Sequence, residues 1–298
     1  MKVLIAVTHL LGTGHLSRAL TLARAFAVAG HQVRVASGGF PAPQLKTDGV
    51  DLLQIPPLRS DGADFARLLT PDGAEAEDSY LSSRQEAFCA ALRELQPDIL
   101  ITELYPFGRR KLKAEFLALL EAACALPRRP LVLSSIRDIL APPSKPARAE
   151  ETDAVIAEFY DAVLVHSDPA ATRLEASWPV TDMLAAKLHY TGYVAPPAAG
   201  LHPDRASAGD VLVSAGGGSV GTPLYETALE AARLDLDALA ALGRSLGADG
   251  IDMMEPFLVT LDGATEAGDT FARLLMAPPS PPEDPFTGSA TGAMAAYL

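Results

Sequence analysis

The sequence has little cysteine and no long apolar run. Its 298 residues include two cysteines, Cys89 and Cys124, which are too few for a disulfide framework. Both are expected to be buried as small apolar side chains in a reducing cytoplasm. No stretch approaches the ~18–20 apolar residues that span a bilayer. The short apolar run at residues 3–7 predicts a strand rather than a signal peptide, so we expect a cytoplasmic protein without a transmembrane segment.

Basic residues are scarce as well. The chain has 24 Lys and Arg against 37 Asp and Glu, a formal net charge of −13 and a pI near 4.9. A nucleic-acid-binding surface needs clustered Lys and Arg, so no nucleic-acid partner is expected. The deficit is sharpest after residue 234, where ten acidic residues accompany two arginines and no lysine. This shift in composition suggests that the chain joins two different parts.

Apolar runs alternate with helical patterns over the first two thirds of the chain. Residues 2–7 predict a strand, residues 16–29 a helix that Gly30 ends, and residues 32–36 the next strand. Further strands are predicted at 98–102, 131–135, 162–165, 211–214, 253–261 and 270–276. In the first two thirds the alternation predicts parallel βαβ units, so the expected fold class is α/β with a Rossmann-like, doubly wound parallel sheet.

A glycine loop joins the first predicted strand to the first predicted helix. Gly12 and Gly14 stand directly before His15. Glycines there let the backbone approach a ligand closely, and a helix N-terminus favours an anion. The position three after Gly14 is Ser17, so the full dinucleotide fingerprint is absent. Taken alone, the loop is equally typical of a tight turn.

The sequence around this loop resembles the N-terminal domain of GT-B fold glycosyltransferases. It is similar to the branch that contains the peptidoglycan UDP-N-acetylglucosamine transferase, and to the bacterial predicted glycosyltransferases. The likeness begins at His-Leu-Leu-Gly-Thr-Gly-His, residues 9–15, and covers about residues 1–230. Its further blocks lie at residues 97–103, 137–140, 160–165 and 190–194. The acceptor-side domain is therefore expected over residues 1–200.

The resemblance implies an inverting, metal-independent hexosyltransferase that needs no cofactor and takes a nucleotide-sugar as co-substrate, with an acceptor still to be identified. His15 is expected near the acceptor as general base, a role that suits an imidazole with an ordinary pKa of about 6.5. Glu103, at the end of a strand, is expected to face the cleft. The alternatives are that His15 caps the helix and that Glu103 is a solvated surface carboxylate. Arg137 and Asp138 form either an ion pair or part of the cleft lining.

A second glycine loop follows the strand predicted at residues 211–214. Ser214, Gly216, Gly217 and Gly218 resemble the start of the GT-B C-terminal domain, whose loop holds the donor diphosphate through backbone N–H groups. This part is expected over residues 201–234, after a Pro- and Ala-rich linker. Beyond it the sequence shows no further glycine-rich loop and no acidic residue suited to the donor ribose. We therefore expect an incomplete donor domain.

The last segment, residues 235–298, resembles a different family. Residues 283–293 are similar to the signature of the PhzF-like isomerases and epimerases of phenazine biosynthesis, so α+β character is expected here. Asp284, Gly288 and Ser289 belong to this motif, in which a helix N-terminus holds a carboxylate. Asp284 and Ser289 equally suit helix capping. The final helix has an unpartnered apolar face, which favours self-association through this segment.

These patterns leave three functions open. The first is a GT-B glycosyltransferase, or an inactive remnant of one if the incomplete donor domain abolishes transfer. The second is a PhzF-like isomerase that works without a cofactor. The third is a non-catalytic hybrid of the two families.

Overall fold

The computed structural model describes residues 1–60 and 67–195, with Val213, Glu226 and three short strands beyond them. The chain divides into two units, Met1–Pro196 and Pro197–Leu298. In the second unit the described strands form an antiparallel sheet in the order β11-β10-β9. Their bounds are β9 Phe257–Thr260, β10 Phe271–Leu275 and β11 Glu283–Asp284. The first two lie within the strands predicted from the sequence.

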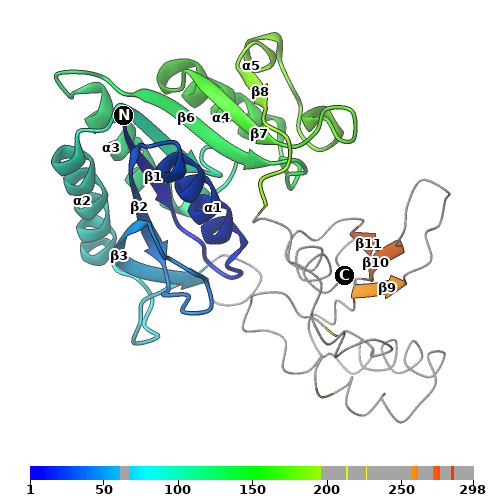
Figure 1. Cartoon of the computed structure of the whole chain (residues 1–298), viewed down its shortest axis with the longest axis horizontal. Coiled ribbons are helices and arrows are strands. Elements are labelled where there is room, and N and C mark those ends of the chain that lie inside the picture. The colour runs from blue at the N-terminus through cyan, green and yellow to red at the C-terminus, as the bar shows by residue number, and fades with distance from the viewer. Residues whose placement is uncertain are drawn as a thin grey trace. The chain divides into compact units, whose positions relative to one another are not determined.

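The first unit is built on an eight-stranded sheet in the order β4-β3-β2-β1-β5-β6-β7-β8 (Figure 1). Neighbouring strands are parallel except for the antiparallel pair β3 and β4. The strands are β1 Lys2–Val7, β2 Gln32–Gly39, β3 Asp51–Ser60, β4 Leu68–Leu69, β5 Ile99–Glu103, β6 Leu131–Arg137, β7 Ala162–His166 and β8 Leu188–Tyr190. The chain runs outward from β1 to β4, then returns to the other side of β1 as β5. The order therefore reverses between β1 and β5.

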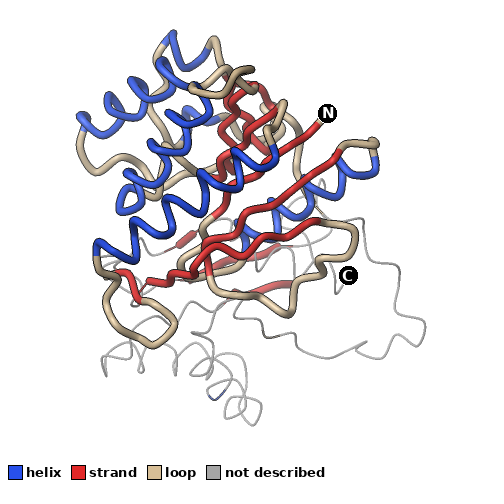
Figure 2. The backbone as a smooth tube through the Cα atoms, turned by 90° about the vertical axis from the view of Figure 1, so that its left-hand side faces the viewer, coloured by secondary structure: helices blue, strands red, loops and turns tan. Residues whose placement is uncertain are grey.

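Helices cover both faces of this sheet (Figures 1 and 2). In β1, Val3 and Ile5 pack in a cluster with residues of α1, whereas Leu4 and Ala6 pack in a cluster with residues of α2, α3 and α4. All four side chains are fully buried, as expected of a strand covered on both faces. The helices are α1 Gly14–Val28, α2 Asp78–Leu95, α3 Lys113–Cys124, α4 Pro146–Phe159 and α5 Asp182–Ala185, with short 3₁₀ helices η2 Arg110–Leu112 and η3 Leu174–Ala176.

The predicted fold class, a doubly wound α/β domain with a largely parallel sheet, is confirmed in the first unit. The strands expected at 2–7, 32–36, 98–102, 131–135 and 162–165 correspond to β1, β2, β5, β6 and β7. Gly30 has a φ of +82° directly after the C-cap of α1, which suits a glycine. Strand β3 was not predicted, because Pro56 and Pro57 interrupt its pattern and lack the amide N–H that a strand donates.

One expectation about the cysteines is wrong. Cys89 is buried in α2, as predicted, but Cys124 is exposed at the end of α3. Leu120 and Ala123 of α3 face the core and are fully buried. The next residue is turned by about 100° around the helix, which brings Cys124 to the solvent side.

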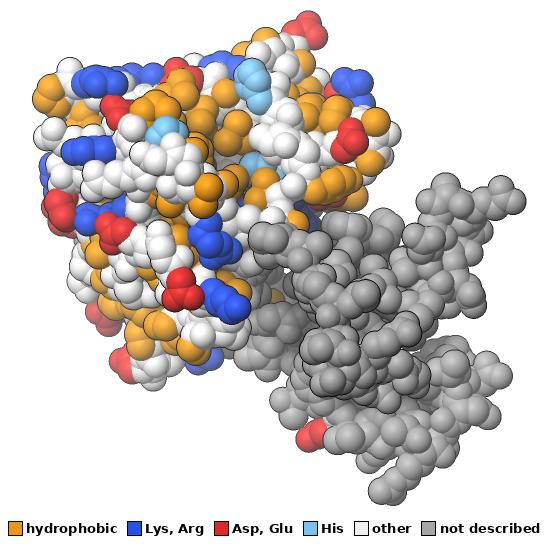
Figure 3. All heavy atoms as spheres, viewed as in Figure 1, with side chains coloured by type: hydrophobic (Ala, Val, Ile, Leu, Met, Phe, Trp, Pro, Cys, Tyr) orange, Lys and Arg blue, Asp and Glu red, His pale blue; other side chains and the backbone are white. Residues whose placement is uncertain are grey.

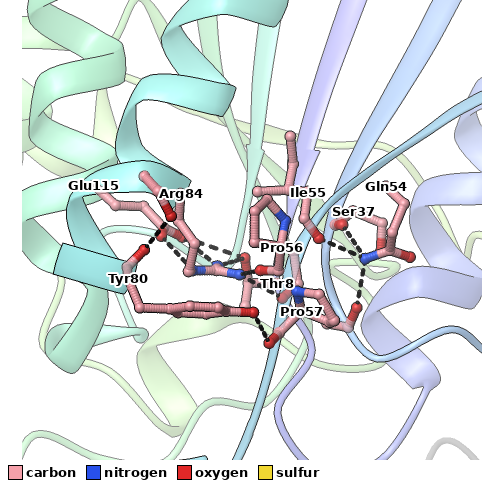
Figure 4. Close-up of polar contacts among 12 residues, drawn as sticks. Thr8, Ser37, Gln54, Ile55, Pro56, Pro57, Tyr80, Arg84 and Glu115 are labelled. Carbon is pink, nitrogen blue, oxygen red and sulfur yellow. Dashed lines mark hydrogen bonds and ion pairs between the residues drawn. The ribbon is translucent and has the colours of Figure 1, made fainter. Parts of the chain in front are cut away.

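A buried ion pair ties α2 and α3 to the sheet (Figure 4). Arg84 of α2 is fully buried and makes two parallel bonds of 3.0 Å to the carboxylate of Glu115 in α3. Its remaining N–H groups reach the carbonyls of Gly38 and Pro56 and the Thr8 hydroxyl. All the donors of the guanidinium are thus satisfied, as burial of a charge requires.

The outer surface of the first unit carries charges of both signs. On the face shown in Figure 3, Lys and Arg side chains are interspersed with Asp and Glu. Ion pairs of this unit include Arg34 with Asp51 at 2.7 Å and Arg129 with Asp161 at 2.9 Å. No helix in the described residues is both long enough and apolar enough to cross a membrane.

Candidate active site

Polar side chains collect at the carboxyl edge of the sheet, next to the point where its strand order reverses. Glu103 is the last residue of β5 and His166 the last residue of β7. Ser135 lies in β6 directly beside Glu103 in the strand register. Doubly wound sheets bind their ligands at this edge, and the reversal between β1 and β5 is the usual place.

His15 and Glu103 form the centre of this site. The loop after β1 turns into α1, whose second residue is His15. The His15 Nδ1 atom lies 2.9 Å from Glu103 Oε1, although the two residues are 88 positions apart. Glu103 is 1% exposed and His15 is 23% exposed. Glu103 is therefore not a solvated surface carboxylate, whereas its role in facing the cleft stays a prediction.

This contact defines the protonation of the imidazole. A carboxylate only accepts hydrogen bonds, so the 2.9 Å contact requires a proton on His15 Nδ1, which donates it to Glu103. Arg18 Nη2 lies 3.3 Å from the same Nδ1, and because both atoms are then donors, this longer contact is not a hydrogen bond. The Nε2 atom of His15 then carries the lone pair, and no hydrogen bond is recorded for it within the described part of the chain. His15 does not cap its own helix. The N-cap residue of α1 is Thr13, and no side-chain hydrogen bond caps this end of the helix.

Arg18 holds the same carboxylate from one turn further along α1. Its Nε and Nη2 atoms lie 3.1 and 2.5 Å from Glu103 Oε1. Burial alone would raise the pKa of the Glu103 carboxyl, but Arg18 and His15 together hold it well below its usual range. Glu103 is therefore an anion at neutral pH.

The second oxygen of Glu103 begins a chain of hydrogen bonds along the sheet edge. Ser135 Oγ donates to Glu103 Oε2 at 2.5 Å and lies 2.9 Å from His166 Nε2. Because the serine proton is used on Glu103, His166 Nε2 must donate to Ser135. His166 Nδ1 then accepts from the Thr191 hydroxyl at 2.7 Å. The network fixes the carboxylate from both sides.

Both site histidines are neutral at neutral pH. Burial, with the nearby charge of Arg109, lowers the pKa of His15 to about 4 against the opposing effect of its bond to Glu103. Burial and the charge of Arg18 lower the pKa of His166 to about 4. A neutral His15 with a free Nε2 lone pair can accept a proton from a hydroxyl group placed against it.

The other predicted site residues are distributed differently. Gly12 lies in the loop before α1 and Gly14 is the first residue of α1; both are exposed, and a Cβ added at either would meet open space. Asp284 is in β11, and its side chain lies outside the described residues. The remaining glycine-loop and motif residues, Ser214, Gly216, Gly217, Gly218, Gly288 and Ser289, also lie outside them. The roles assigned to these residues and the domain boundaries at 200 and 234 stay predictions.

Several residues of the site were not predicted as members of it. They are Arg18, Arg109, Ser135, His166 and Thr191. The available signal was position, because Ser135, His166 and Thr191 lie at or near the end of a strand in one sheet. Arg137 and Asp138, predicted as an ion pair or as cleft lining, do not pair in the described structure, where Arg137 Nε instead bonds the carbonyl of Ile139.

No family model matches the chain, and no curated protein matches it either. Among solved structures it is similar to MurG of Acinetobacter baumannii, with 16% identity over 65% of this chain and 46% of that one, at a TM-score of 0.38. It is also similar to the calicheamicin glycosyltransferase CalG4, with 14% identity over 67% of this chain and 53% of that one, at 0.37. It is similar as well to the spinosyn forosaminyltransferase SpnP, with 20% identity over 69% of this chain and 54% of that one, at a TM-score of 0.39.

The chain spans about half the length of these three structures. At such identities and scores the function has to be argued from the residues of the site itself. Within the described residues, no group of three or more His, Cys, Asp and Glu side chains is placed to hold a metal ion.

Proposed function

We propose that this chain carries the acceptor-side domain of a GT-B glycosyltransferase. It would transfer a sugar from a nucleotide-sugar to an acceptor hydroxyl, with inversion and without a metal ion. The observation that carries the proposal is the 2.9 Å contact between His15 and Glu103 at the carboxyl edge, beside the reversal of strand order. The glycosyltransferase-like sequence blocks around both residues support it.

In this proposal His15 acts as the general base. Its Nε2 atom takes the proton of the acceptor hydroxyl while that oxygen attacks the anomeric carbon of the donor sugar. The bond from the anomeric carbon to the diphosphate breaks, and the nucleoside diphosphate leaves with the electron pair. Glu103 holds the imidazole through Nδ1–H and stabilises the imidazolium that forms. Arg18 and Ser135 keep the carboxylate ionised and oriented.

The glycine loop gives a first prediction. Neither Gly12 nor Gly14 has a left-handed φ, and a Cβ added at either would meet no atom within 4 Å. The fold itself therefore does not require glycine there, and close approach of a ligand is the remaining reason for it. Gly14→Ala is expected to keep the melting temperature of the wild type and to lose nucleotide-sugar turnover. Wild-type turnover in this variant would remove the loop from the site.

The second prediction tests the base directly. The full chain is incubated with UDP- and dTDP-sugars, and release of nucleoside diphosphate is measured with a candidate acceptor and with water. His15→Gln is expected to lower the rate about 10²–10⁴-fold, the usual contribution of a general base. The control is His31→Gln, because His31 immediately precedes the amino end of β2 at the opposite edge of the sheet. Equal loss in both variants, or none in His15→Gln, contradicts the role of His15.

A further inference from the structure

Arg109 and His9 lie at the same edge of the sheet as the candidate active site. His9 follows β1 by two residues, and Arg109 follows β5 by six, directly before η2. Because β1 and β5 are parallel neighbours, the segments after them emerge side by side at the reversal of strand order. Neither residue has a part in the proton transfer described above.

Both residues bury a nitrogen atom that has no hydrogen-bond partner. These atoms are Arg109 Nε and His9 Nδ1. The Nδ1 atom of His9 is closed off by Gly39 of β2, where an added Cβ would lie 2.4 Å from it, so Arg109 is the residue open to a ligand. His9 is 4% exposed. In the part of the chain that the structure describes, no hydrogen bond or ion pair is recorded for any atom of the Arg109 guanidinium. A buried donor left without an acceptor costs about 1–3 kcal/mol, and more when it is charged. The Arg109 guanidinium therefore lacks a hydrogen-bond acceptor that its burial calls for.

Glu103, the nearby carboxylate, does not supply the missing acceptor for Arg109. Both oxygens of Glu103 are already engaged, one by Arg18 and His15 and the other by Ser135. The charge of Glu103 acts on Arg109, but burial still lowers the pKa of the guanidinium to about 10. Burial is the largest cause that lowers the pKa of His9 and of His15, and the positive charge of Arg109 lowers both further. The site thus holds a positive charge that its own carboxylate does not neutralise.

The backbone between Glu103 and Arg109 is held in a costly conformation. Leu104 and Arg109 have φ values of +69° and +61°, in the left-handed region that non-glycine residues rarely adopt. Each such residue costs about 1–2 kcal/mol. The Leu104 amide is fixed by a 2.8 Å bond to the carbonyl of Ser135, so the turn is anchored to the site. Strain of this kind gathers where the fold presents a side chain for function.

We propose that Arg109 binds an oxyanion carried by the acceptor, either a carboxylate or a phosphate. The inference rests on the proposed function and names the class of acceptor. Arginine suits this role because its planar fork donates two parallel bonds to either group. The acceptor is favoured over the donor as the substrate that carries this oxyanion. The reason is that the charge of Arg109 acts on His15, the residue that would contact the acceptor hydroxyl.

Binding of the anion would also strengthen the base. A bound anion neutralises Arg109 and so removes one of the causes that lower the pKa of His15. The imidazole then becomes a better proton acceptor when the acceptor is in place. The hydrolysis of the donor by water, which brings no anion, would lack this activation.

The test is a titration of the histidine-labelled full chain with inorganic phosphate, followed by NMR of the imidazole rings. Phosphate is expected to shift the His9 and His15 resonances and to raise the pKa of both, while His166 changes little. Arg109→Met is expected to weaken phosphate binding about 10–100-fold, the loss of one or two charge-assisted bonds. The control is Arg110→Met, because Arg110 is the neighbouring, exposed arginine. Equal phosphate affinity in the wild type and Arg109→Met overturns the proposal.

A second arm separates the acceptor from the donor. UDP is added to the phosphate complex, with the same resonances as readout. If UDP binds while the phosphate stays bound at Arg109, the anion site belongs to the acceptor, as proposed. If UDP displaces the phosphate in an Arg109-dependent way, the anion is the donor diphosphate and the assignment is wrong. Failure of the proposed function has a different signature, since no nucleotide-sugar would be turned over although phosphate still binds at Arg109.

Discussion

Replacing Arg84 with methionine is expected to lower the free energy of unfolding of the first unit by about 3–5 kcal/mol, the usual cost of removing one partner of a buried ion pair. Glu115 is 4% exposed, and it would be left as an uncompensated carboxylate among apolar side chains. The carbonyls of Gly38 and Pro56 would also lose their donor. Methionine fills most of the volume, so the loss is mainly electrostatic.

The measurement is urea unfolding followed by the fluorescence of Trp178, the single tryptophan of the chain. Trp178 is 3% exposed in the first unit, so its signal reports on this unit. The matched control is Arg93→Met on the same helix. Arg93 pairs with Glu86 at the surface, where both side chains are more than half exposed, and such pairs contribute about 0–1 kcal/mol.

A double variant, Arg84→Met with Glu115→Leu, separates charge from packing. Replacing a whole buried ion pair by apolar side chains is often neutral, so the double variant should recover most of the stability that Arg84→Met loses. If Arg84→Met costs no more than Arg93→Met, the buried pair does not hold α2 and α3 to the sheet as described.

The same pair shows where prediction from the sequence stops. The strands β1, β2, β5, β6 and β7 were predicted because each is a short apolar run with helical patterns between. Arg84 has partners 76 residues before it, at Thr8, and 31 residues after it, at Glu115. Nothing local distinguishes this arginine from one on a solvated helix face. Its role depends on the packing of α2 against α3 and β3, and β3 itself was hidden by two prolines.

The candidate site was predicted in part for a similar reason. His15 and Glu103 were each assigned to the site, because a glycine loop after the first strand and the end of a later parallel strand share one edge of the sheet, but their contact with each other was not predicted. Ser135 and His166 join them through the strand register, which places Ser135 opposite Glu103 and His166 opposite Arg137. A shift of one residue would turn these side chains to the other face. Apolar periodicity alone does not fix that register.

Acidification is expected to destabilise the first unit more steeply than carboxylates alone would explain. Burial lowers the pKa of His9, His15 and His166 to about 4, below the ordinary value of 6.5. Between these values the unfolded chain binds protons that the folded chain does not. The stability due to the neutral imidazoles is thus complete above about pH 6.5 and is lost as the pH falls towards 4. Three such groups give a slope of about 4 kcal/mol per pH unit near pH 5.

Urea unfolding at a series of pH values between 7 and 5 measures this slope. His166→Gln is expected to reduce it by about one third, because glutamine can bond Ser135 and Thr191 but binds no proton in this range. The control is Leu92→Ala, a fully buried core residue of α2 whose truncation should cost about 2–5 kcal/mol without changing the number of protons bound. A slope that is the same in His166→Gln and the wild type would mean that His166 is already protonated in the folded chain. The Nδ1 atom would then donate to the Thr191 hydroxyl and could not accept from it, whereas Nε2 would still donate to Ser135.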